Sequence, residues 1–168
     1  MPASTPLTKE LIDDAMIHGV QYVFHTMGRI DLSLVDKSQV VEAIPDDAVQ
    51  QIIGNVGFGG SINGLVYLCM PEDFALELTS RVLSMSKAEL IMQGPESLND
   101  TIGEITNMTV GTFKNRLADL GYPCKLTVPT IVRGRGLSVR GIRGASRQVF
   151  HFDYAGTRIS ADLHIQLE

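Results

Sequence analysis

The sequence predicts a single α/β (α+β) domain in which an antiparallel-rich β-sheet packs against two long helices and a shorter one. Two segments of about twenty residues repeat apolar side chains at helical spacing, and shorter apolar segments lie between glycine-rich turns. The length of 168 residues fits one domain, 1–168, with 1–7 as a flexible N-terminus. Hydrophobic residues make up 44% and charged residues 20%, which is typical of a folded soluble protein.

Three helices follow from the apolar spacing and from residues that begin or end helices. The first is expected at Thr8–Met27. The shorter one begins at Pro71, because proline is favoured in the first helical turn. The second long helix begins near Ser97, where Asp100 three residues on gives a start like a capping box, and it ends at Gly121.

The remaining periodic segments are expected to be strands. Gly59 and Gly60 mark the turn of one hairpin, and the neighbouring glycines of that hairpin are expected to form bulges. Pro129 lies inside another strand and implies an edge or a bulge there, since proline cannot donate to a ladder. In the last hairpin, Phe150 is expected to face Leu163. The expected strands are 30–35, 40–44, 49–58, 62–70, 125–132, 146–154 and 158–167.

A polar stripe on the second long helix is the strongest functional signal in the chain. Asp100, Glu104, Asn107, Gly111 and Lys114 share one side of this helix at 100° per residue. The carboxylate of Glu104 and the amide of Asn107 thus lie one turn apart, beside Gly111, which lets another surface approach closely. The opposite, apolar side is formed by Leu98, Ile102, Ile105, Thr109, Phe113, Leu117 and Leu120.

The two halves of the chain have a similar outline, which suggests an internal duplication. Each half begins with a long helix followed by strands and a glycine-rich connection. When Gly19 is aligned with Gly111, Ile12 and Ala15 take the positions of the acid and the amide. In this hypothesis the first helix is the same element without the polar pair.

The stripe also matches a family sequence pattern. In this pattern Asp or Ser is followed by three intervening residues and Glu, then by two intervening residues and Asn, and later by a Pro. Here the pattern reads Asp100, Glu104, Asn107 and Pro129, with the proline one residue nearer to the asparagine than is usual. On these residues the chain resembles the CheC/CheX family of chemotaxis phosphatases, and most closely its CheX branch. CheC proteins typically carry two such helices, so a chain with one motif helix is similar to the CheX branch, which has a single site.

The resemblance implies a CheC-like domain that removes phosphate from the aspartyl phosphate of a CheY-type response regulator. Asn107 would orient the attacking water, and Glu104 would dock on the lysine of the receiver. Asp100, Gly111 and Pro129 would support this pair. The protein would need no cofactor or metal of its own, because Mg²⁺ would belong to the receiver's site. The resemblance further implies a homodimer joined through sheet strands.

Two other functions compete with this interpretation. One is a non-catalytic module that binds a receiver or resembles flagellar-switch proteins. The other is an RNA contact through the arginines of the glycine-rich run 132–147. No aromatic residues alternate with these arginines, and the net charge is −5, so a flexible, solvated loop is the favoured interpretation and nucleic acid is not an expected partner.

The remaining residues point to no metal site and no membrane. His18 and His25 are not spaced as the metal ligands of a helical motif are. His151 is expected to pair with Asp162 on the surface of the last hairpin. Both cysteines lie in apolar runs and are expected to be reduced and buried. The N-terminus does not read as a secretory signal, and no apolar run is long enough to span a bilayer. A cytoplasmic location is therefore expected.

Overall fold

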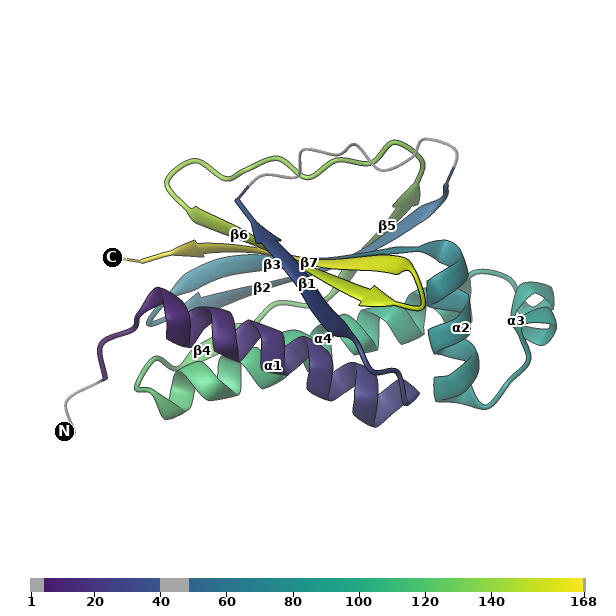
Figure 1. The fold of residues 1–168 in the computed structure, drawn as a ribbon, viewed down its shortest axis with the longest axis horizontal. Coiled ribbons are helices and arrows are strands. Elements are labelled where there is room, and N and C mark those ends of the chain that lie inside the picture. Colours follow the sequence, from purple (N-terminus) through teal and green to yellow (C-terminus); the bar gives the residue numbers. More distant parts are fainter. Residues whose placement is uncertain (1–4, 40–48, 168) are drawn as a thin grey trace.

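A seven-stranded antiparallel sheet covered on one face by helices forms the body of the protein (Figure 1). The computed structural model describes residues 5–39 and 49–167, so the strand predicted at 40–44 and most of the predicted N-terminal segment lie outside the described residues. The helices are α1 (Lys9–Gly28), α2 (Glu72–Leu83), α3 (Lys87–Gln93) and α4 (Glu96–Asp119). The strands are β1 (Ser33–Ser38), β2 (Gln51–Gly60), β3 (Asn63–Pro71), β4 (Cys124–Leu126), β5 (Thr130–Gly134), β6 (Ser146–Tyr154) and β7 (Thr157–Gln166).

The order of the strands in the sheet has an internal symmetry. It reads β1-β6-β7-β3-β2-β4, with β5 also pairing with β2. When the half made of α1 to β3 is exchanged with the half made of α4 to β7, the order reads the same from the other end. The first strand of each half pairs with a strand of the other half, β1 with β6 and β4 with β2. This exchange agrees with the predicted internal duplication.

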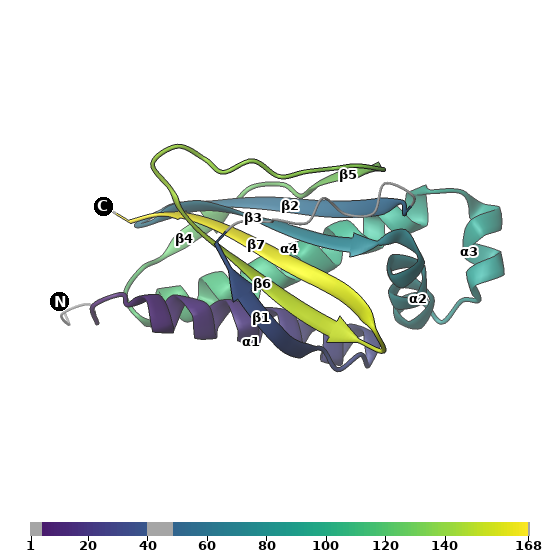
Figure 2. The same cartoon turned by 45° about the horizontal axis from the view of Figure 1, so that its top comes forward.

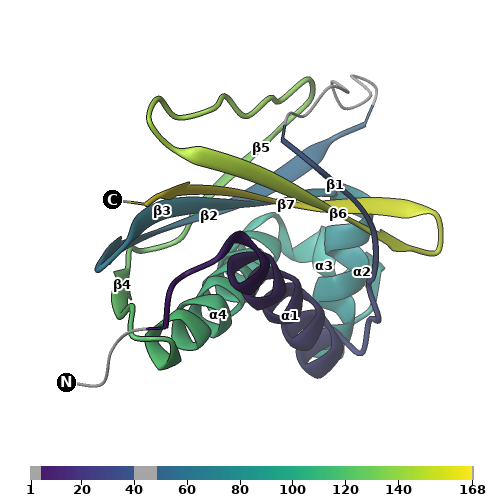
Figure 3. The same ribbon diagram turned by 60° about the vertical axis from the view of Figure 1, so that its left-hand side comes forward.

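Two layers are evident when the molecule is viewed from its side (Figure 3). The helices α1 and α4 cross beneath the sheet, and the long connection from β5 to β6 passes over the opposite face (Figures 1, 2 and 3). The core lies between the sheet and the two long helices, where Phe24, Phe113, Phe150 and Phe152 are fully buried. The rings of Phe58 on β2 and Phe113 on α4 pack edge to face at 5.6 Å, which ties α4 to the sheet.

The last hairpin has a register different from the predicted one. Ala155 and Gly156 form a two-residue turn with φ of 50° and 84°, values typical of the tight hairpin turn that matches strand twist. Phe150 therefore faces Ala161 rather than Leu163. The shift is two residues, so each apolar side chain keeps the face that was predicted for it.

Three other expectations about local structure were wrong. The helix α4 begins at Glu96 without a side-chain cap, and the Ser97 hydroxyl donates to Gln93 instead of capping the helix. The pairing of β2 with β3 runs without a bulge, and its turn lies at residues 61–62. The helix α3 was not predicted, because its seven residues are too short to show a clear period.

Candidate active site

Two glycines outside α4 fix how this helix lies in the fold. A Cβ on Gly19 of α1 would lie 2.9 Å from the carbonyl oxygen of Thr109, so the two helices cross at close contact. On the sheet side, a Cβ on Gly54 of β2 would collide with the side chain of Thr106, whose hydroxyl donates to the Ile102 carbonyl at 2.7 Å. The remaining side of α4 is therefore turned away from both neighbours.

The polar stripe lies on this remaining side of α4. Glu104 and Asp100 are exposed, whereas Asn107 and Gly111 are half-buried. Within residues 5–39 and 49–167, neither Glu104 nor Asn107 has a side-chain hydrogen bond or an ion pair. The carboxylate and the amide are thus available to a partner, one helical turn apart.

The apolar side of α4 was predicted correctly, with one difference at its end. Leu120 is half-buried and follows the last residue of the helix. The other six residues of that side are buried: Leu98, Ile102, Ile105, Thr109, Phe113 and Leu117.

The chain between β4 and β5 runs alongside the stripe and brings Pro129 to it. A Cβ on Gly103 would lie 3.9 Å from Cγ of Pro129, and a Cβ on Gly111 would lie 3.8 Å from Cδ1 of Leu126. Asn107 is midway between these two glycines on α4. Pro129 was predicted to support the site, whereas Gly103 and Leu126 were not. The four-residue spacing of Gly103, Asn107 and Gly111 places these three residues on one strip of the helix, so Gly103 could have been found from the sequence.

Pro129 belongs to a β-bulge, as its position in a strand predicted. Leu126 pairs with Phe58, and Thr130 pairs with Asn55, so three residues between these pairs (127–129) face two residues of β2 (56–57). Thr127 stays on the ladder, because its N–H donates to the Gly57 carbonyl and its hydroxyl accepts from the Gly57 N–H, both at 2.9 Å. The irregular part is therefore Val128–Pro129.

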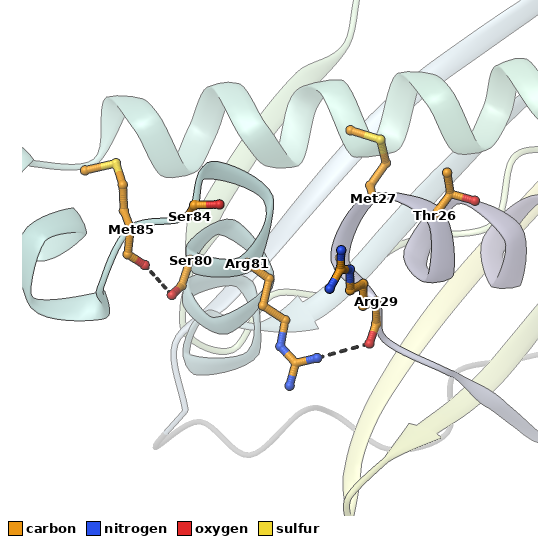
Figure 4. Close-up of a pocket in the computed structure, with 8 residues that line it drawn as sticks. Thr26, Met27, Arg29, Ser80, Arg81, Ser84 and Met85 are labelled. Atoms are coloured by element: carbon orange, nitrogen blue, oxygen red, sulfur yellow. Dashed lines mark hydrogen bonds between the residues drawn. The ribbon is translucent and has the colours of Figure 1, made fainter.

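The stripe lies on an open side of α4, and a pocket formed by described residues lies elsewhere. That pocket, of about 760 Å³, lies between the C-terminal ends of α1 and α2 (Figure 4). Arg81 crosses it and donates to the Arg29 carbonyl at 3.0 Å (Figure 4). No residue of the stripe lines it.

The arginine run divides into structural and exposed side chains. Arg133 pairs with Glu72, and Arg147 forms two hydrogen bonds with the buried Asp162, at 2.9 and 2.6 Å. The predicted surface pair of His151 with Asp162 was therefore wrong, and His151 faces Ser160. The other three arginines of the run, in the connection from β5 to β6, are exposed: Arg135, Arg140 and Arg143.

In the part of the chain that the structure describes, no group of three or more His, Cys, Asp or Glu side chains is arranged to hold a metal ion. Cys69 and Cys124 are both free, and Cys124 is buried. Among the described helices, none has the length and apolar character needed to cross a bilayer.

The antiparallel sheet with its helices on one face is the fold of CheC-like proteins. The chain belongs to the CheX family, because the family model for the chemotaxis phosphatase CheX matches residues 52–153. It is 31% identical over 85 residues to the CheY-P phosphatase CheX of Thermotoga maritima, a match that covers 51% of this chain and 53% of that protein. The match thus spans about half the length of this relative.

Solved structures show the same fold over nearly the whole chain. The chemotaxis protein CheX from Vibrio vulnificus has a TM-score of 0.79 and 23% identity, with 92% of this chain and 99% of that chain covered. CheX of Borrelia burgdorferi, solved as a CheX–CheY–BeF₃–Mg²⁺ complex, has a TM-score of 0.74 and 18% identity, with 93% and 98% covered.

Proposed function

We propose that this protein hydrolyses the aspartyl phosphate of a CheY-type response regulator. The observation that carries the proposal is that Glu104 and Asn107, one turn apart on the open side of α4, have no side-chain hydrogen bond or ion pair within the part of the chain that the structure describes. Family membership and the Borrelia complex with CheY support the choice of partner. Water would attack the phosphorus, the bond from phosphorus to the aspartyl oxygen would break, and inorganic phosphate and a free carboxylate would leave.

Asn107 is the residue proposed to orient the attacking water. An acyl phosphate has a good leaving group, so the reaction needs a water held in line with the phosphorus more than it needs a strong base. A carboxamide can both donate to and accept from that water. The half-buried Asn107, flanked by Gly103 and Gly111, has no competing partner among the described residues.

Glu104 is the residue proposed to dock on the receiver. Its exposed carboxylate lies one turn before Asn107 and can pair with the lysine beside a receiver's phosphate. Such a pair would fix the register of α4 against the receiver and so place Asn107 over the phosphorus. Asp100, one turn further out, would add negative charge that steers the same lysine. In this scheme Mg²⁺ stays with the receiver.

The proposal includes the assembly and the location implied by the resemblance. The strand β1 is at the edge of the sheet and exposes Leu34 and Val35, which gives a surface for a homodimer joined through strands. Light scattering on the purified protein tests the dimer. The phosphorylated receivers that it would serve are cytoplasmic, and so would be this protein.

Dephosphorylation of a cognate receiver by three variants tests the assignment. Asn107→Ala is expected to lower kcat at least about 100-fold with little change in affinity, since it removes only the positioning of water. Glu104→Ala is expected to weaken binding about 10-fold or more. Asn115→Ala is the matched control, because Asn115 is exposed on the same helix two turns beyond Asn107 and is expected to change neither quantity.

The same assay separates catalysis from binding alone. Binding of the phosphorylated receiver without any faster loss of phosphate would identify the non-catalytic module. Unchanged dephosphorylation by Asn107→Ala would show that the assignment of the water-orienting residue is wrong.

A further inference from the structure

A highly exposed valine lies in the bulge beside the stripe. The side chain of Val128 is 83% exposed, and among the described large apolar residues only Met92 is more exposed, at 88%. Val128 is outside the regular ladder, because Thr127 is the last residue before the bulge that bonds to β2. The exposure is therefore not a by-product of strand pairing.

The bulge lies level with the acid–amide pair. Leu126 contacts α4 near Gly111, and Pro129 contacts it near Gly103. Val128 lies between these two contacts along the chain, as Asn107 lies between the two glycines along the helix. A protein surface seated on Glu104 and Asn107 would therefore meet Val128 at the edge of the same contact.

The first half of the fold contains a similar bulge without a polar pair beside it. In β1, Leu34 faces Phe152 and Asp36 faces His151, which leaves Val35 as the extra residue. Val35 is also exposed, at 52%. The helix of that half carries the buried Ile12 and Ala15 in place of the acid and the amide. The molecule thus provides an internal comparison for Val128.

We propose that Val128 contacts the phosphorylated receiver and gives the docking surface its apolar anchor beside Glu104 and Asn107. This inference rests on the proposed function. A polar pair in water contributes mainly to orientation and on-rate, whereas an apolar contact that loses its water on binding strengthens the complex itself. Val128 would therefore act on affinity and leave the hydrolysis step to Asn107.

Val128→Ser and Met92→Ser, compared with the unmodified protein, test this role. Met92 is the matched control, because it is an apolar side chain on α3 that is as exposed as Val128, at 88%. The probes are a cognate CheY-type receiver held in its active form with beryllofluoride and Mg²⁺, for affinity, and the phosphorylated receiver, for kinetics. Val128→Ser is expected to raise Kd and KM about 5- to 20-fold and to leave kcat within about 2-fold. Met92→Ser is expected to change each quantity less than about 2-fold.

Three outcomes would overturn the inference. Unchanged affinity in Val128→Ser would show that the receiver does not contact this residue, and an equal loss in Met92→Ser would show that the effect is not local to the stripe. A change in self-association without a change in receiver affinity, seen by sedimentation velocity, would assign Val128 to a second copy of the chain.

The unmodified protein shows which proposal has failed. If it dephosphorylates the receiver while Val128→Ser behaves the same, only the role of Val128 is wrong. If it neither binds nor dephosphorylates the receiver, the proposed function fails and this inference fails with it.

Discussion

A Cβ on Gly111 would lie 3.8 Å from Cδ1 of Leu126, which is an ordinary van der Waals distance. The fold therefore has room for alanine at this position. Glycine inside a helix costs about 1 kcal/mol relative to alanine. Packing within the chain therefore does not explain why position 111 is a glycine. The close approach of a partner is the remaining physical reason.

Gly111→Ala is expected to make the protein more stable and less active. The free energy of unfolding should rise by about 0.5–1 kcal/mol, from the helix propensity of alanine. Receiver affinity should fall, because the methyl group is added on the side that carries Asn107. Urea unfolding measures the first effect, and titration with the activated receiver measures the second.

Gly103→Ala is the matched control for this trade-off. Gly103 is on the same helix, and its Cβ would lie 3.9 Å from Pro129, but the residue is buried. A similar gain in stability with unchanged receiver affinity is expected. Equal losses of affinity in the two variants would mean that Gly111 has no special relation to the partner.

Gly54→Ala is expected to displace α4 from the sheet. A Cβ there collides with Thr106, the residue immediately before Asn107. Overpacking of this kind costs about 1–3 kcal/mol. Both the free energy of unfolding and kcat should fall. Gly141→Ala, with nothing within 4 Å of its Cβ, should leave both unchanged, and a tolerated Gly54→Ala would contradict the close contact.

The helices could be predicted well because their signal is local. The buried side of α4 follows from a repeat of 3.6 residues, and six of its seven predicted residues are buried. The stripe could be predicted for the same reason, since the outer side of a helix is fixed once its inner side is known. The bulge at Pro129 followed from the missing N–H of proline.

What could not be predicted depends on contacts between distant segments. The hairpin register depends on whether Ala155 adopts a positive φ, for which alanine gives no signal. The burial of Asp162 on β7 depends on Arg147 reaching it diagonally from the neighbouring strand β6. The positions of Leu126 beside Gly111 and of Pro129 beside Gly103 depend on where β4 joins β2, which no local pattern encodes.

The divided roles of the arginines predict unequal effects on stability. Arg147→Ala would remove the charged partner of the buried Asp162 and leave the His164 ring, at 2.9 Å, beside its carboxylate, at a cost of about 3–5 kcal/mol. Arg143→Ala, in the exposed loop, should change the free energy of unfolding by less than about 0.5 kcal/mol. Urea unfolding of both variants measures the contrast. Equal effects would contradict the pairing of Arg147 with Asp162.

The histidines predict how stability depends on pH. Burial lowers the pKa of His164 from the ordinary value of 6.5, and the nearby Arg147 lowers it further, although Asp162 opposes the shift. Burial also lowers the pKa values of His18 and His151. Each of these side chains therefore stays neutral in the folded protein at a pH where the unfolded chain already binds a proton.

The sign of the effect follows from proton binding. Below about pH 6.5 the unfolded state holds more protons than the folded state, so the free energy of unfolding should fall as the pH is lowered, by up to about 1.4 kcal/mol per pH unit for each such histidine. Urea unfolding between pH 5.5 and 7.5 measures this slope, and His164→Gln should make it shallower. NMR titration of the imidazole resonances gives a second test that needs no variant. A His164 ring that protonates above pH 6.5 in the folded protein would reverse the predicted sign for this residue.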